Sequence, residues 1–158
     1  MKTLIIGYGN PYRRDDGVGY HVINAVATRL GRPPLALDED GLDALGEDID
    51  LVSLPQLLPE LAETLAGYDQ VIFVDAHTGA YAEDLRCTAV KPRYAPSAFT
   101  HHMTAETLLG LTLAFTEDVP PAYLFSIRGY DFDFGLGLSA ETERLVAEAV
   151  ERIMDMIT

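Results

Sequence analysis

Side chains that could carry out chemistry occur at three separate places in this chain. Two adjacent carboxylates, Asp15 and Asp16, follow an apolar run and a glycine-containing turn. Asp75 ends a second apolar run, and the pair His101 and His102 precedes a third apolar region. Carboxylates and imidazoles that converge on one crevice form divalent-metal sites or acid–base sites. The pattern therefore predicts a site assembled from distant segments, provided that the fold brings them together.

Each acidic group also has a structural interpretation. Carboxylates such as Asp15 and Asp16 can satisfy free backbone amides at a helix start. Gly17 and Gly19 favour a functional interpretation, because positions without side chains would let another group approach the carboxylates. Asp75 could cap loop amides, but an ionised group at the end of a buried strand needs a partner.

Other chemistry is disfavoured. The third glycine of a dinucleotide-binding motif that begins Gly7-x-Gly9 would fall at Tyr12, and no phosphate-binding lysine follows. Cys87, the single cysteine, lies in a strand-like segment, where cysteine behaves as a small apolar residue. His77 follows Asp75 by two residues and could share its face if the strand continues, although Gly79 favours a turn.

The elements that must position these groups follow from apolar periodicity. Strands and helices mostly alternate, which predicts an α/β fold with a largely parallel central sheet and helices on both faces. The predicted strands span residues 2–7, 48–54, 70–75, 85–90 and 122–127; the predicted helices span 16–30, 57–65, 102–115 and a last helix capped by Ser139. Because the carboxyl edge of such a sheet binds ligands, Asp75 and the Asp15-Asp16 pair are expected to meet there.

Composition limits the possible partners. With 158 residues the chain is expected to form one domain, residues 1–158. Its net charge of −14 argues against binding to nucleic acid or to an anionic membrane surface. A lone cysteine and the absence of a long apolar run indicate a cytoplasmic protein, which we expect to be a monomer. The acidic segment 32–47 is predicted to be a mobile surface loop with one helical turn, and its role stays open.

Taken together, six motifs resemble the hydrogenase maturation proteases, which trim the C-terminal extension of the large subunit of nickel–iron hydrogenases. The motifs keep their order along nearly the whole chain. They are G-Y-G-N at 7–10, D-D-G-V-G at 15–19, L-P-E-L-A-E at 58–63, V-I-F-V-D-A at 71–76, T-H-H-M at 100–103 and L-S at 138–139.

The resemblance implies a three-layer α/β/α sandwich with a five-stranded sheet. It also implies three residues that contact nickel and carry the catalysis: Asp16, Asp75 and His101, with His102 as the alternate. Some relatives have a glutamate where this chain has Asp16. Nickel is expected to arrive bound to the precursor of the hydrogenase large subunit, which would be the protein's partner and substrate. Carboxylate and imidazole donors suit nickel.

The residues leave the mechanism and two other functions open. The metal could polarise the scissile carbonyl or a water, or a carboxylate could act as a general base. A signalling receiver domain would use Asp15-Asp16 with magnesium and a phosphorylated Asp75, although the last strand supplies no lysine. A nickel-dependent binding module without hydrolytic activity could share every ligand.

Overall fold

The computed structural model describes residues 1–94 and 103–158. The strands found there are β1 (Thr3–Tyr8), β2 (Ile49–Leu54), β3 (Gln70–His77), β4 (Leu85–Val90) and β5 (Ala122–Arg128). The α-helices are α1 (Val18–Arg29), α2 (Leu61–Leu65), α3 (Ala105–Thr112) and α4 (Ala140–Ile157), with short 3-10 turns η1 (Arg14–Gly17) and η2 (Leu42–Ala44). All the expected strands and helices are therefore present.

The five strands form one sheet in the order β2-β1-β3-β5-β4. The pairs β1–β2, β1–β3 and β3–β5 are parallel, and β4 pairs antiparallel with β5. The chain leaves β1 for β2 on one side and later returns past β1 to β3 on the other. The carboxyl ends of β1 and β3 therefore flank the point at which the strand order reverses, where open α/β sheets bind ligands.

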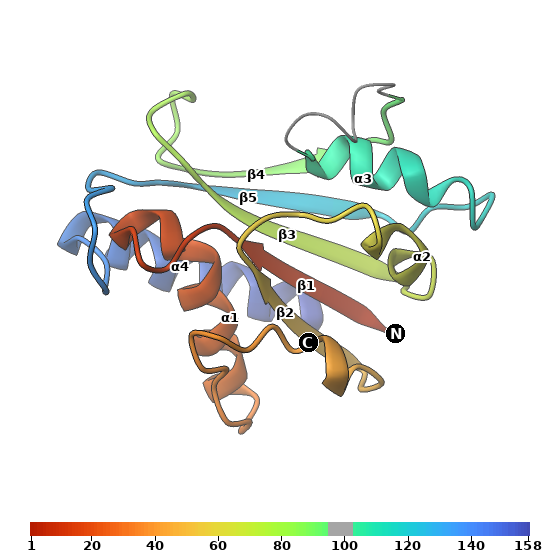
Figure 1. Ribbon diagram of the computed structural model, residues 1–158, viewed down its shortest axis with the longest axis horizontal. Coiled ribbons are helices and arrows are strands. Elements are labelled where there is room, and N and C mark those ends of the chain that lie inside the picture. Colours follow the sequence, from red (N-terminus) through yellow and green to blue (C-terminus); the bar gives the residue numbers. More distant parts are fainter. Residues whose placement is uncertain (95–102) are drawn as a thin grey trace.

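Helices cover both faces of the sheet (Figure 1). Side chains of α1 and α4 pack with Ile5, Ile72 and Phe125 in one core cluster. Those of α2 and α3 pack with Ile6 and Phe73 in the other. This alternation along each strand is what a parallel sheet buried on both faces requires. The predicted three-layer α/β/α sandwich is confirmed.

Some element boundaries differ from those predicted. Helix α2 begins at Leu61 and not at residue 57, because the residues around Pro59 form a tight turn in which the Leu61 N–H donates to Leu58 O (3.1 Å). Helix α3 begins after its N-cap, Thr104, and ends at Thr112. The three following residues form i→i−3 hydrogen bonds, a common ending for an α-helix.

Helix α1 rests directly on the backbone of β1. A Cβ atom built on Gly7 would lie 2.4 Å from Gly19 O, and one built on Gly19 would lie 2.5 Å from Tyr8 N. Gly17 is similarly close to Pro11, with 2.7 Å to its Cα. The prediction that Gly17 and Gly19 leave room for another group at the carboxylates is wrong, because the chain itself fills this space. Their function is to let α1 approach the sheet.

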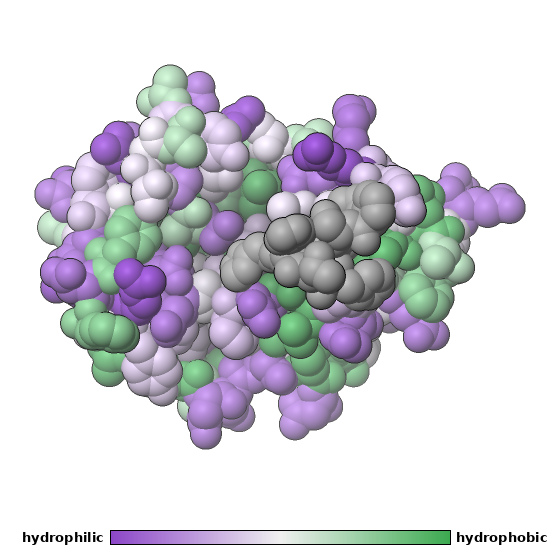
Figure 2. Space-filling model, turned by 45° about the horizontal axis from the view of Figure 1, so that its top comes forward, coloured by the Kyte–Doolittle hydropathy of each residue, from purple (hydrophilic) through white to green (hydrophobic). Residues whose placement is uncertain are grey.

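The surface is mostly hydrophilic on the face shown in Figure 2, where apolar side chains form separate patches. No helix in residues 1–94 or 103–158 is long and apolar enough to cross a membrane.

Candidate functional site

Asp75 lies where β3 reaches the carboxyl edge of the sheet. The pairing of Gly7 with Val74 puts Tyr8 of β1 beside Asp75 of β3. Successive side chains of a strand point to opposite faces, so Asp75 shares a face with Phe73, which packs against α2 and α3. The Asp75 Oδ1 atom accepts a hydrogen bond from the N–H of Ala76 (2.8 Å). The carboxylate is half-buried and is held in one orientation.

Tyr8 is a member of this site that the sequence analysis missed. Its hydroxyl lies within hydrogen-bonding reach of the Asp75 carboxylate. Burial, followed by the charges of Asp75 and Glu106, raises the pKa of Tyr8 above its usual range. The hydroxyl therefore keeps its proton and acts as a donor to Asp75. No local signal marks Tyr8, since its position depends on the register between β1 and β3.

Asp16 reaches the same edge from η1. Its Oδ2 atom accepts a hydrogen bond from the N–H of Asn10 (2.8 Å), in the loop that leaves β1. Gly9 makes this turn possible, because its φ of 135° is strained for any other residue and an added Cβ would lie 2.2 Å from Asp16 O. The G-Y-G-N and D-D-G-V-G motifs therefore form one structural unit that orients Asp16.

The charge of Asp16 contributes to the pKa of Asp75, as expected for two carboxylates at one edge of the sheet. This pKa is raised from 3.8 to about 7, chiefly by burial. The Ala76 N–H and the Tyr8 hydroxyl oppose the rise, and the charge of Asp16 adds to it. Two like charges at one edge favour a cation between them or a proton on one of them. The structure thus brings together Asp16 and Asp75, two of the predicted site residues.

The titration of Asp75 provides a direct prediction. We expect the carboxyl carbon of Asp75 to titrate with a midpoint near the value of about 7 in carbon-13 NMR. Asp16→Asn should lower the midpoint because it removes a neighbouring negative charge, whereas Tyr8→Phe should raise it because it removes a donor to the charged form. A midpoint near the ordinary 3.8, or shifts of the same sign in both variants, would contradict this arrangement.

Asp15 points away from this edge and has a structural role. Its carboxylate is fully buried and accepts hydrogen bonds from the N–H groups of Tyr130 (2.8 Å), Asp131 (3.0 Å) and Ser139 (2.8 Å). The hydroxyls of Ser139 (2.6 Å) and Thr142 (3.0 Å) also donate to it. Burial alone would raise the pKa of Asp15, but these hydrogen bonds outweigh it and lower the pKa to about 2.

The adjacent carboxylates therefore do different work. Asp15 fastens the loop between β5 and α4 to η1, and Asp16 is left at the sheet edge. The magnesium-binding pair that a receiver domain would need is not formed by Asp15 and Asp16, since the first of them is fully used within the protein.

His101 and His102 lie outside the described residues. Met103, the first described residue after this pair, is buried in the core cluster on the face that Asp75 shares. Within residues 1–94 and 103–158, no three His, Cys, Asp or Glu side chains form a group that could hold a metal ion. The assignment of a third ligand to His101, or to His102, stays a prediction.

Two further side chains considered from the sequence have structural roles. The buried His77 ring accepts a hydrogen bond from the N–H of Gly79 (3.1 Å) and lies 3.3 Å from Asp84 O, so it shapes the connection between β3 and β4. Burial raises the pKa of the Cys87 thiol, which disfavours the reactive thiolate.

Comparison with known proteins yields matches at the level of structure. No protein-family model and no curated protein matches the sequence. Among solved structures, the hydrogenase maturating endopeptidase HybD from E. coli superposes with a TM-score of 0.67 at 19% identity, over 99% of this chain and 92% of that one. The [NiFe] hydrogenase maturation protease HybD from Thermococcus kodakarensis gives 0.63 at 19%, over 100% of both chains. The protease HycI from the same organism gives 0.65 at 19%, over 99% and 92%.

This chain has the fold of the hydrogenase maturation endopeptidases. At this level of identity the likeness establishes the fold, and the architecture expected from the resemblance to that family is confirmed. The roles expected for Asp16, Asp75 and His101 stay predictions.

Proposed function

We propose that the protein is a processing endopeptidase that removes the C-terminal extension from the precursor of a nickel–iron hydrogenase large subunit. One observation carries the proposal. Two carboxylates from distant segments, Asp16 and Asp75, are held at the sheet edge between β1 and β3. They lie there in a fold shared with proteins named as hydrogenase maturation endopeptidases.

Nickel enters this proposal as part of the substrate. The precursor brings the metal, and Asp16, Asp75 and His101 (or His102) would complete its coordination. Without the cation the charges of Asp16 and Asp75 oppose one another, which adds to the effect of burial in raising the pKa of Asp75. A loaded precursor relieves this repulsion and an empty one does not, so recognition of nickel would follow from differential binding.

Two routes to cleavage suit this donor set. In the first, nickel on the substrate polarises the scissile carbonyl or a water. In the second, a carboxylate takes the proton of the attacking water, and a pKa of about 7 suits Asp75 to this role near neutral pH. Replacing nickel in the precursor by metals of different Lewis acidity separates the routes, because only the first predicts a strong dependence of the cleavage rate on the metal.

The decisive experiment is a processing assay. The purified protein is mixed with nickel-loaded precursor, and intact mass spectrometry follows the large subunit. We expect a mass loss equal to the C-terminal extension with loaded precursor and no loss with nickel-free precursor. If loaded precursor binds but stays intact, the protein is a nickel-dependent binding module and the proposal fails. If the protein neither binds nor cleaves either precursor, a role in processing or binding the hydrogenase large subunit is excluded as well.

The receiver alternative has less support. Arg128, the last residue of β5, ion-pairs with Asp84 (3.7 Å) and stacks over Tyr130, so it does not replace the missing lysine at Asp75. We expect no acyl-phosphate on Asp75 after incubation with acetyl phosphate and magnesium, measured by mass spectrometry.

A further inference from the structure

The acidic segment that follows α1 lies along the outer edge of β2. At one end the N–H of Ser53 donates to Asp40 O (3.0 Å), which attaches the segment to this edge strand. At the other end the Leu35 N–H donates to the Asn24 side chain (2.8 Å), which attaches it to α1. The helical turn expected from the sequence is η2. The segment therefore forms a wall that is fastened to both a helix and the sheet.

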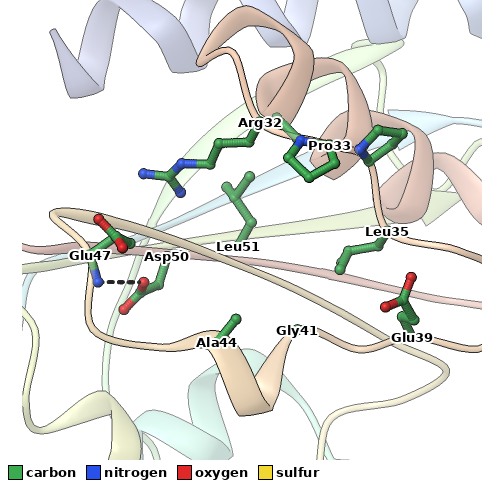
Figure 3. A pocket seen from close by; sticks show the side chains of 11 residues that line it. Arg32, Pro33, Leu35, Glu39, Gly41, Ala44, Glu47, Asp50 and Leu51 are labelled. Atoms are coloured by element: carbon green, nitrogen blue, oxygen red, sulfur yellow. Dashed lines mark hydrogen bonds between the residues drawn. The ribbon is translucent and has the colours of Figure 1, made fainter.

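A cavity of about 430 Å³ lies between this wall and the sheet (Figure 3). Cavities of this order are typical of small-molecule sites, which combine apolar walls with a few polar groups. The apolar residues that line it are Ala27, Pro33, Pro34, Leu35, Ala44 and Leu51. The cavity shares no lining residue with the candidate site at the edge between β1 and β3. Any ligand that it holds is therefore distinct from a group bound by Asp16 and Asp75.

Strand β2 offers an unused backbone donor on this side. Ile49 and Ser53 direct their peptide groups outward, since Ile49 O accepts from the Arg32 guanidinium and the Ser53 N–H donates to Asp40 O. Alternate residues of a strand face the same way, so Leu51 between them also presents its N–H outward. Within residues 1–94 and 103–158 this N–H has no hydrogen-bond partner. It can donate to an oxygen of a bound molecule.

Arg32 lines the cavity with a guanidinium group whose charge is not balanced. The side chain is half-buried and donates to Ile49 O, and it forms no ion pair with any described residue. Asp50 cannot supply the missing anion, because its carboxylate already accepts from the N–H of Glu47 (3.0 Å) and from the Tyr68 hydroxyl (2.5 Å). A guanidinium has five N–H donors in a planar fork that matches a carboxylate. Arg32 therefore has donors left for a carboxylate that the described residues do not provide.

Two exposed carboxylates of the same cavity carry the opposite charge. Glu39 and Glu47 both line it, and neither forms an ion pair within the described part of the chain. One oxygen of Glu39 accepts from the Ala36 N–H (2.8 Å), and the other stays available. Figure 3 shows the two glutamates and the guanidinium of Arg32 around one space. Charges of both signs therefore surround an apolar cavity without neutralising one another.

We propose that this cavity binds a free α-amino acid with an apolar side chain. The carboxylate of the ligand accepts hydrogen bonds from the Arg32 guanidinium and the Leu51 N–H, and its ammonium group pairs with Glu39 or Glu47. Its side chain packs against the apolar walls. A ligand with one charge alone would leave either the guanidinium or the glutamates uncompensated, so the cavity selects a zwitterion. This inference goes beyond the proposed function and does not depend on it.

The test is a binding experiment with L-leucine and two analogues of the same carbon skeleton. Isoamylamine lacks the carboxylate, and isocaproate lacks the amine. Nitrogen-15 HSQC spectra of the whole protein follow each titration. We expect leucine to cause saturable shifts at residues 32–35, 39–47 and 49–51. Each analogue should bind about tenfold more weakly, because each loses a charge-assisted hydrogen bond. No saturable shift with leucine, shifts confined to other residues, or equal binding of either analogue would overturn the proposal.

Two variants assign the two charges of the ligand to their partners. Arg32→Gln should abolish the preference for leucine over isoamylamine and keep the preference over isocaproate. The double variant Glu39→Gln, Glu47→Gln should do the reverse, and glutamine at position 39 can still accept the Ala36 bond. If either variant keeps both preferences, the proposed contacts are wrong.

A matched control and a folding check complete this test. The control Arg144→Gln, Glu148→Gln changes charges of both signs at exposed positions of α4 and should keep both preferences. An equal loss in this control would show that the preferences reflect the overall charge of the protein, and the proposal would fail. Circular dichroism reports whether Arg32→Gln folds. If it does not, the glutamate variant and the two analogues still decide the outcome.

Discussion

Asp75→Asn is expected to reduce the processing of nickel-loaded precursor by at least about 100-fold. Asparagine keeps the size of the side chain and can still accept the Ala76 N–H bond. It loses the charge that attracts a cation and the basicity that would take a proton from water. The measurement is kcat/KM from intact mass spectrometry, together with calorimetric titration of the variant with nickel-loaded precursor.

Stability distinguishes this loss from a folding defect. Folding raises the pKa of Asp75 from 3.8 to about 7, so its contribution favours the folded state at low pH and is lost as the pH rises through about 7. At pH 8 the variant should therefore be at least as stable as the wild type in urea denaturation. Asp69→Asn, just before the start of the same strand, is the matched control and should process normally. Wild-type rates in the Asp75 variant would remove this carboxylate from the mechanism.

Asp15→Ala is expected to destabilise the protein by roughly 3 kcal/mol or more, because it leaves several donors without a partner in a buried place. The donors come from Tyr130, Asp131, Ser139 and Thr142, so the loop before α4 should loosen as well. Urea denaturation measures the first effect, and amide hydrogen exchange at residues 130–139 measures the second.

The pH dependence of this effect has the opposite sign from that of Asp75. Folding lowers the pKa of Asp15 from 3.8 to about 2, so its contribution is complete above about 4 and is lost as the pH falls through about 2. The free energy of unfolding of the Asp15→Ala variant should lack this part of its dependence on acidic pH. Asp133→Ala, at an exposed position of the same loop, is the control, and we expect a change within about 0.5 kcal/mol. A similar small change in Asp15→Ala would show that the buried bonds contribute little.

The secondary structure could be predicted because apolar periodicity is local. The predicted strands and helices all occur in the described part of the chain, although α2 and α3 are shorter than predicted. Strand β3 continues to His77 because its partner β5 extends alongside it. The sequence could not predict that Asp15 is buried and structural while Asp16 lies at the sheet edge. The hydrogen-bond donors that bind Asp15 lie more than 110 residues away in sequence. The sequence showed an acidic pair, and only the tertiary structure separates its members.

The candidate site was predictable only in part for the same reason. Asp75 could be recognised because a charge that ends an apolar strand is conspicuous in any sequence. Tyr8 could not, because its place beside Asp75 follows from strand pairing. The glycines after Asp16 were noticed for the right property, the missing side chain, but the group that approaches them is the protein's own backbone.

That contact between α1 and β1 has a consequence for the proposed recognition of a metal ion. Gly7 and Gly19 bring the backbones of strand and helix into direct contact. No side chains lie between them at this point, so nothing there could deform to accommodate a displacement of the helix. Asp16 lies just before the start of this helix, so the contact with the sheet restricts its movement. If Asp16 binds a cation as proposed, its oxygens would need little rearrangement, and the backbone would supply the positional tolerance of a few tenths of an ångström that metal coordination demands.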